Sequence, residues 1–161
     1  MLKPAVFFVL FAAFPTAYAE YRQIDVDVRD LDCASCVTSL TGSLKKIRGV
    51  EKAEIGTSEG IVKITLAAEN KVTLERVRDQ IKGAGFTPGA AKVVVRGKAI
   101  TDAGKWQFTI EGPNQTYLLT TTNDDVVTKL KAGGVFTVAG ICPAMANPRD
   151  QPVLEVQSIR E

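Results

Sequence analysis

Residues 24–47 read IDVDVRDLDCASCVTSLTGSLKKI, and this stretch carries the strongest fold signal in the chain. Apolar and polar residues alternate over 24–28, which is typical of a half-buried β-strand. Apolar residues then recur at steps of three and four over 37–47, which predicts a helix. Cys33 and Cys36 lie between the two patterns, so the sequence predicts a strand, a cysteine-bearing loop and a helix in that order.

The next elements continue a βαββα order. Residues 50–55 and 61–66 read as the two strands of a hairpin, because a glycine-bounded turn separates them. Thr73 can cap a second helix, which ends before the glycine-rich break at 83–89. One more strand would complete a ferredoxin-like βαββαβ unit, so the predicted fold class is α+β.

From about Ala90 the sequence pattern becomes typical of an all-β region. Candidate strands cover 92–100, 105–111, 116–121, 135–141 and 153–159, with a short helix at 124–131 between the third and the fourth. This is the element order of an OB-like five-stranded β-barrel, and a generic small β-sandwich is the alternative.

The chain therefore divides into three expected parts. These are a signal peptide at 1–19, a ferredoxin-like domain at 20–90 and an OB-like β domain at 91–161. The valines at 93–95 suit either the last strand of the first domain or the first strand of the second, and the two units can share or abut at that strand. The boundary is accordingly expected between 88 and 97.

The amino terminus has the features of a secretory signal peptide. Lys3 is followed by an apolar run from Ala5 to Phe14, and Ala17-Tyr18-Ala19 is a small-x-small cleavage signature. Cleavage is expected after Ala19, which predicts a periplasmic or secreted protein. An uncleaved anchor or a buried helix is the alternative. No second long apolar run follows, so the mature chain is not expected to span a membrane.

Charge and histidine content exclude several function classes. The formal net charge is +2, without the broad cationic field of a nucleic-acid-binding protein, so no nucleic-acid partner is expected. The 161 residues contain no histidine. A Ser-His-Asp triad, a Cys-His dyad and a histidine-ligated metal site are therefore excluded within the chain.

The Cys33-Ala34-Ser35-Cys36 motif is the strongest indication of chemical function in this sequence. By itself a CxxC motif can be a redox pair, half of a zinc site or a simple disulfide. Here it follows a strand and opens a helix, whose positive end lowers thiol pKa values and favours thiolates. Two convergent thiolates select a soft ion such as Cu(I), Zn(II), Cd(II) or Hg(II).

Residues 22 to about 89 resemble a heavy-metal-associated domain, as found in copper chaperones, periplasmic mercury-binding proteins and metal-exporting P-type ATPases. The resemblance rests on 31–36, on Gly49-Val50 and on Gly85-Phe86. It implies that Cys33 and Cys36 are metal ligands. The family commonly has Gly-Met where this chain has Asp30 and Leu31, and Leu31 can fill the apolar slot of that methionine. Phe86 stands where chaperones of the family often place a lysine and ATPase domains an aromatic residue.

Further metal ligands are expected at two places. The resemblance to domains of zinc- and cadmium-exporting ATPases implies that the Asp32 carboxylate joins the two sulfurs, which would favour Zn(II) or Cd(II). The alternative is an exposed Asp32 or a helix cap. Cys142 and Met145 could hold Cu(I) as a thiolate–thioether pair. Alternatives are a half-buried Cys142 with Met145 as packing, or a Cys142 that completes a three-sulfur site with the CxxC loop.

The predicted function is an exported soft-metal-ion binding protein, a chaperone or scavenger and not an enzyme. The CxxC thiolates would hold the ion and pass it on by ligand exchange, with a membrane metal transporter or P-type ATPase as the partner. Two alternatives remain at this point. One is a thiol–disulfide oxidoreductase, and the other is an interaction module whose CxxC cysteines form a structural disulfide.

Overall fold

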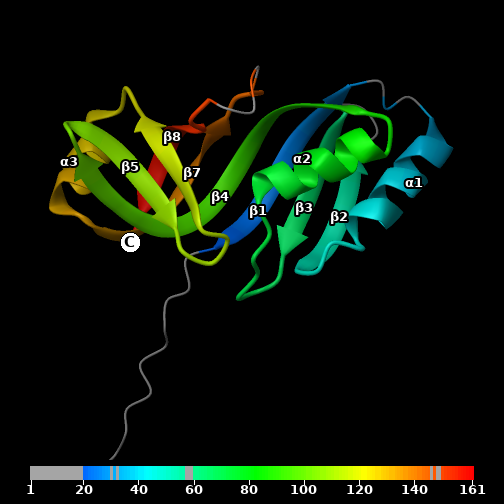
Figure 1. Cartoon of the computed structure of the whole chain (residues 1–161), viewed down its shortest axis with the longest axis horizontal. Helices are drawn as coiled ribbons and strands as arrows, with labels where there is room; N and C mark the ends of the chain where they lie inside the picture. The colour runs from blue at the N-terminus through cyan, green and yellow to red at the C-terminus, as the bar shows by residue number, and fades with distance from the viewer. Residues whose placement is uncertain (1–19, 30, 32, 57–59, 146, 148–149) are drawn as a thin grey trace, which may run out of the picture.

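The computed structural model describes residues 20–29, 31, 33–56, 60–145, 147 and 150–161, so the expected signal peptide lies outside the described residues. The elements, shown in Figure 1, are β1 (Tyr21–Arg29), α1 (Ala34–Leu44), β2 (Val50–Gly56), β3 (Ile61–Leu66), α2 (Leu74–Gly83), β4 (Thr87–Asp102), β5 (Lys105–Ile110), β6 (Gln115–Thr120), α3 (Asp124–Ala132), β7 (Gly134–Cys142) and β8 (Val153–Arg160). None of the helices in this part of the chain is long and apolar enough to cross a bilayer.

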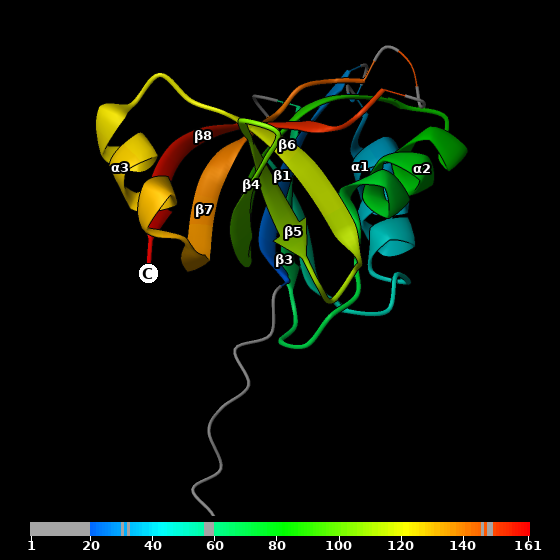
Figure 2. The same cartoon turned by 60° about the vertical axis from the view of Figure 1, so that its left-hand side comes forward.

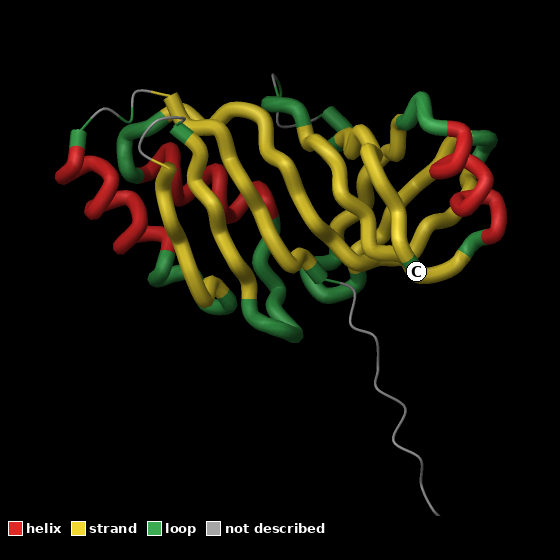
Figure 3. The backbone as a smooth tube through the Cα atoms, turned by 180° about the vertical axis from the view of Figure 1, so that it is seen from behind, coloured by secondary structure: helices red, strands yellow, loops and turns green. Residues whose placement is uncertain are grey.

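The first half of the chain has the predicted ferredoxin-like order. Four strands form an antiparallel sheet in the order β2-β3-β1-β4. Figure 3 shows α1 and α2 behind this sheet, so both helices cover the same face. The expected βαββαβ order and the α+β class are confirmed for this half.

Side-chain alternation in β1 explains why the sheet has one covered face. Ile24, Val26 and Val28 are buried under the helices, whereas the intervening Gln23 and Asp27 are exposed on the opposite face. The helices contribute the other side of this core through residues at helical spacing: Leu40, Leu44, Leu74, Val77 and Ile81.

Strand β4 is longer than the sequence indicates. The expected break at 83–89 is wrong at its end, because Thr87 pairs with Arg29 and Pro88 with Val28. Hydrogen bonding to the edge of β1 extends the strand, and a proline is tolerated near a strand start. Further along, residues 91–95 have β1 on one side and β7 on the other. A single continuous strand therefore belongs to both halves of the molecule.

The second half is the expected β-rich region, with five strands and one helix between the third and fourth. Its strand pairings close a ring, β4-β5-β6-β8-β7-β4, in which only β6 and β8 run parallel. Figure 2 shows this ring beside the helix-covered sheet, with α3 at its far end. The aromatic side chains Phe108, Tyr117 and Phe136 are buried in it.

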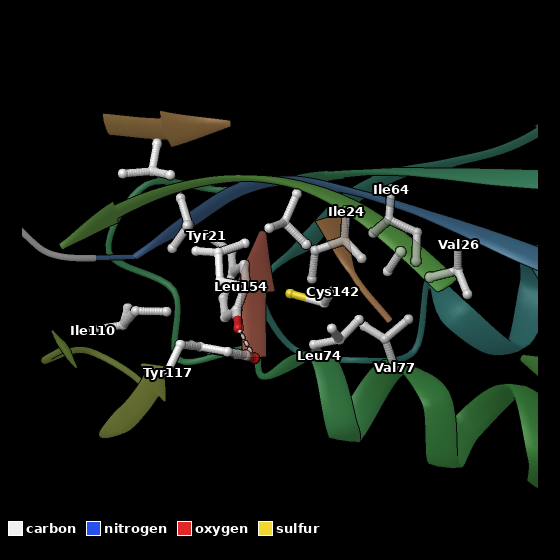
Figure 4. Close-up of a cluster of buried hydrophobic side chains, with 14 of the residues drawn as sticks. Tyr21, Ile24, Val26, Ile64, Leu74, Val77, Ile110, Tyr117, Cys142 and Leu154 are labelled. Atoms are coloured by element: carbon white, nitrogen blue, oxygen red, sulfur yellow. Dashed lines mark hydrogen bonds between the residues drawn. The ribbon is translucent and has the colours of Figure 1, made fainter. Parts of the chain in front are cut away.

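The two halves meet through a buried polar chain. The hydroxyls of Tyr21 and Tyr117 are hydrogen bonded, as the dashed line in Figure 4 shows. Tyr21 also donates to Gln115 Oε1 at 3.0 Å, and the Gln115 amide donates to the Glu75 carboxylate of α2. Burial raises the pKa of both tyrosines well above the ordinary value, so the hydroxyls stay protonated donors. These bonds join β1, β6 and α2 across the junction.

Candidate metal centre

Cys33 and Cys36 are brought together by the start of α1. Cys33 is the N-cap residue, with an extended backbone conformation, and Cys36 lies in the first turn of the helix. Their Cα atoms are 5.1 Å apart and their sulfurs are joined in a disulfide. The two side chains therefore converge on one point, and the structure shows the oxidised form of the pair.

Two hydrogen-bond partners converge on the sulfur of Cys33. The backbone N–H of Cys36 donates to Cys33 Sγ at 3.0 Å, as in an N-cap interaction. The hydroxyl oxygen of Ser35 lies 3.1 Å from the same sulfur. The first turn of α1 contains no acidic residue. After reduction, this N–H and the helix end would stabilise a thiolate, the form that binds soft metals.

The side chains expected to flank the loop are partly buried. Leu31 and Phe86 both pack against the hydrophobic core, and their predicted place beside the metal ligands stays a prediction. Phe86 directly precedes β4, whose first residue pairs with Arg29 at the end of β1. Asp32 lies outside the described residues, so its predicted role as a ligand or cap stays a prediction.

Cys142 lies in a different environment. It is a free cysteine at the end of β7, and Figure 4 shows its sulfur among the core side chains near Ile24, Leu74 and Leu154. Burial raises the pKa of its thiol to about 12. This environment disfavours the thiolate that a metal site would need.

Met145 does not share that environment. It lines a groove of about 230 Å³ between α2 and the chain after β7, together with Glu75, Asp79 and Pro88 but without Cys142. The structure thus places the predicted thiolate–thioether pair in separate surroundings.

The three-sulfur alternative is wrong for the described residues. They contain no cluster of three or more Cys, Asp or Glu side chains that could hold a metal ion. The strand register gives the reason: Cys142 pairs with Ala91, which pairs with Val26, whereas the cysteine loop begins beyond Arg29. Because β4 lies between β7 and β1, the sulfur of Cys142 is kept away from those of Cys33 and Cys36.

Sequence reasoning missed the residues that join the halves. Arg78 is 93% buried in α2, and its guanidinium donates to backbone carbonyls of Gly89, Cys142 and Pro143. A signal for it exists, because Arg78 lies four residues after Leu74 on the otherwise apolar face of the helix. Its partners could not be identified before β7 was placed.

The cysteine loop and its sheet match a known family. The sequence profile described as "Heavy-metal-associated domain" matches residues 25–87. No curated protein matches the chain.

Several solved structures are similar to part of the chain. The CopZ metallochaperone is 24% identical and aligns over 41% of this chain and 97% of its own, with a TM-score of 0.39. The yeast copper transporter domain Ccc2a is 24% identical over 42% of this chain and 90% of its own, with a TM-score of 0.39. A copper binding domain from HMA7, a P-type ATPase, is 28% identical over 45% of this chain and 92% of its own, again with a TM-score of 0.39. With the profile match, the convergent cysteines and the ferredoxin-like sheet together, residues 25–87 of this chain are a heavy-metal-associated domain.

Proposed function

We propose that the protein binds a soft metal ion through the reduced thiolates of Cys33 and Cys36 and hands that ion to a partner. The convergence of the two sulfurs at the start of α1 carries the proposal. It is supported by the heavy-metal-associated domain that contains the motif and by the N–H donor on Cys33 Sγ. The ion is cargo, and the protein is proposed to be a chaperone or scavenger with no catalytic activity of its own.

Cu(I) is the cargo that the donor set favours. Two thiolates suffice for a linear Cu(I) complex, whereas Zn(II) and Cd(II) prefer four ligands. The chain has no histidine to supply further ligands, and Cys142 is buried elsewhere. Hg(II) suits two thiolates as well. A carboxylate contribution from Asp32 would shift the preference towards Zn(II) or Cd(II), so the selected ion reports on that residue.

Loading begins with reduction of the disulfide. A dithiol reductant supplies two electrons and two protons, which converts the Cys33–Cys36 bond into two thiols. Binding of the ion then displaces the thiol protons. In the transfer step a thiolate of the partner attacks the bound ion and one of the two cysteines leaves, so the ion passes between sulfur ligands without a general base. A membrane metal transporter or P-type ATPase is the proposed partner.

We place the mature protein in the periplasm or outside the cell, after cleavage behind Ala19. The environment of Glu20 supports this position for the new terminus. The Glu20 side chain is buried, and its carboxylate accepts a hydrogen bond from the Asn70 N–H and pairs with Arg22. Residue 20 is thus already part of the fold. The mass of the protein isolated from a periplasmic fraction tests the proposed cleavage.

The C-terminal ring is proposed to be an OB-like barrel that docks on the membrane partner. The closed order of its five strands, the parallel β6–β8 pair and the helix before β7 support this assignment. Phe108 and Tyr117 are buried and offer bases no stacking surface, and the net charge is only +2. We therefore propose no nucleic-acid partner. The division of the chain at residue 90 also remains a proposal, which the shared strand β4 makes testable.

Anaerobic native mass spectrometry of reduced residues 20–161 tests the metal proposal. Cu(I), Zn(II), Cd(II) and Hg(II) compete for the protein, and the Cys33→Ser/Cys36→Ser variant is compared with Cys142→Ser as the matched control. We expect one ion bound by the parent and by Cys142→Ser and none by the double variant. Stoichiometric binding that survives the double variant, or no binding by the reduced parent, would refute the proposal.

The observed disulfide favours two further candidates, a thiol–disulfide oxidoreductase and an interaction module with a structural disulfide. These readings separate from the metal proposal under reducing conditions. An oxidoreductase would turn over a disulfide substrate with Cys33 and Cys36 alternating between states. A structural disulfide would resist reduction in a glutathione buffer, and the protein would unfold once the disulfide was reduced. The metal proposal expects a folded, reduced protein that takes up one ion.

A further inference from the structure

The Arg78 guanidinium connects the two halves of the molecule at one point. Its Nη2 atom donates to the carbonyl oxygens of Gly89 at 3.2 Å, Cys142 at 3.1 Å and Pro143 at 2.9 Å. Gly89 belongs to the start of β4, whereas Cys142 and Pro143 belong to the end of β7 and the chain after it. One side chain of α2 thus holds the metal-binding domain and the ring together.

The Arg78 guanidinium is unusual because it is a buried cation that, within the described part of the chain, only backbone carbonyls stabilise. Among the described residues no carboxylate forms an ion pair with it, and its Nε has no hydrogen-bond partner. A buried charge is costly unless other groups stabilise it, and here carbonyl dipoles are the stabilising groups. All three of these hydrogen bonds come from the single Nη2 atom, at the far end of the side chain. The ammonium of a lysine lies one atom closer to the backbone, so from this helix position it would not reach the three carbonyls without a shift of α2. The site therefore favours arginine for its length.

The Arg78 contacts continue to the base of the cysteine loop. Gly89 is packed tightly, since a Cβ at this position would lie 3.2 Å from a carboxylate oxygen of Asp27. The two residues before Gly89 pair with the last residues of β1: Pro88 with Val28 and Thr87 with Arg29. The cysteine loop follows Arg29, and Phe86 precedes Thr87. Holding Gly89 thus fixes both chain segments that frame the cysteines.

We propose that Arg78 is a positioning residue for the metal loop, through which the C-terminal ring controls how tightly Cys33 and Cys36 hold their ion. The inference rests on the proposed metal-binding function. Removal of Arg78 leaves the β4–β7 pairing from Ala91 onward but deletes the hydrogen bonds that tie Gly89 to Cys142 and Pro143, so residues 87–89 and the paired end of β1 gain freedom. The two sulfurs then share one ion in a less ordered loop, and the ion dissociates faster.

The test compares Arg78→Met with Arg76→Met in the chain of residues 20–161. Arg76 lies on the same helix but is exposed, so its replacement controls for loss of one positive charge from α2. The first readout is the rate at which reduced, Cu(I)-loaded protein releases copper to a chelator. The second is amide hydrogen exchange of the oxidised, metal-free protein at Val37, whose N–H donates to the Cys33 carbonyl, and at Val127 in the first turn of α3.

We expect Arg78→Met to release copper about tenfold faster than the parent, a loss at the lower end of that seen for partners of metal ligands. Val37 should exchange about tenfold faster, with Val127 and the Arg76→Met protein unchanged. Arg78→Lys should also release copper faster than the parent, because it keeps the charge but its ammonium lies one atom short of the position of Nη2, and it decides the question if Arg78→Met does not fold. Unchanged copper release and unchanged Val37 exchange in a folded Arg78 variant would overturn the inference. A parent that binds no copper would overturn the proposed function instead, and Val37 exchange would still report on loop positioning.

Discussion

Truncation of the chain after Ala90 tests how much of the heavy-metal-associated domain depends on the C-terminal half. The cut leaves β1 with Pro88 and Thr87 as its partners from β4. It removes the five other register pairs between the two strands, which extend from Tyr21–Val95 to Val26–Ala91. Strand β1 carries the centre of the core, so its loss as an inner strand affects the whole sheet. We expect the 20–90 fragment to be far less stable than the chain of residues 20–161.

The magnitude follows from the buried residues that are lost. Val93 and Val95 are 2% and 0% exposed and contribute about 2 kcal/mol each, and Ala91 adds about 1 kcal/mol. The hydrogen bonds of five paired residues add about 1 kcal/mol each. The entropy cost of ordering the same residues, about 1.2 kcal/mol each, offsets somewhat more than half of this gain. Exposure of Tyr21 costs about 2 kcal/mol more, so the net loss is about 6 kcal/mol. That loss equals most of the stability of a small domain.

Urea unfolding followed by far-ultraviolet circular dichroism measures this difference, with the Cys33–Cys36 disulfide intact in both proteins. A second fragment, residues 20–97, keeps every β1–β4 pair and should unfold cooperatively at an intermediate urea concentration. A 20–90 fragment with the unfolding midpoint of the 20–161 chain would refute the reasoning. It would show that the domain boundary lies at residue 90 and that β1 needs no inner-strand partner beyond it.

Three further predictions concern the junction and the ring, and urea unfolding measures each. For Cys142→Ala we expect a pH-dependent effect in the disulfide-bonded protein: the parent loses stability relative to the variant as pH rises above 9.0, because the unfolded thiol ionises there while burial raises the folded pKa to about 12. A parent–variant difference that is the same at pH 8 and pH 10 would contradict this. For Gly97→Ala we expect the free energy of unfolding to fall by about 1–3 kcal/mol, since the new Cβ would lie 2.6 Å from the Thr109 carbonyl oxygen. An unchanged unfolding midpoint would contradict this and show that β5 can shift away from the new methyl group. Tyr117→Phe should lower the free energy of unfolding by about 1 kcal/mol, and Tyr21→Phe by more, because the Tyr21 hydroxyl bonds both Tyr117 and Gln115 whereas the Tyr117 hydroxyl bonds only Tyr21 among these groups. The reverse order would contradict the assigned donor network.

Local patterns sufficed for the elements of the first half and for the cysteine pair. Alternation over 24–28 and helical spacing after Cys36 follow from the geometry of strands and helices, and they need no knowledge of distant residues. The spacing of Cys33 and Cys36 placed both thiols at a helix start, and the structure has them there. Strand β4 was less predictable, because the pairing partner of Thr87–Gly89 overrides the turn preference of Pro and Gly.

What the sequence by itself determined is the α+β order, the five C-terminal strands and the position of the cysteines on a strand-to-helix loop. Only the tertiary structure decided that β4 serves both halves, that Cys142 is buried away from the loop, and that Arg78 bonds to Cys142 and Pro143. The physical reason is range. Periodicity and capping act within a few residues of the chain, whereas these features depend on contacts between segments about 35 to 65 residues apart, which exist only once the ring has closed against the sheet.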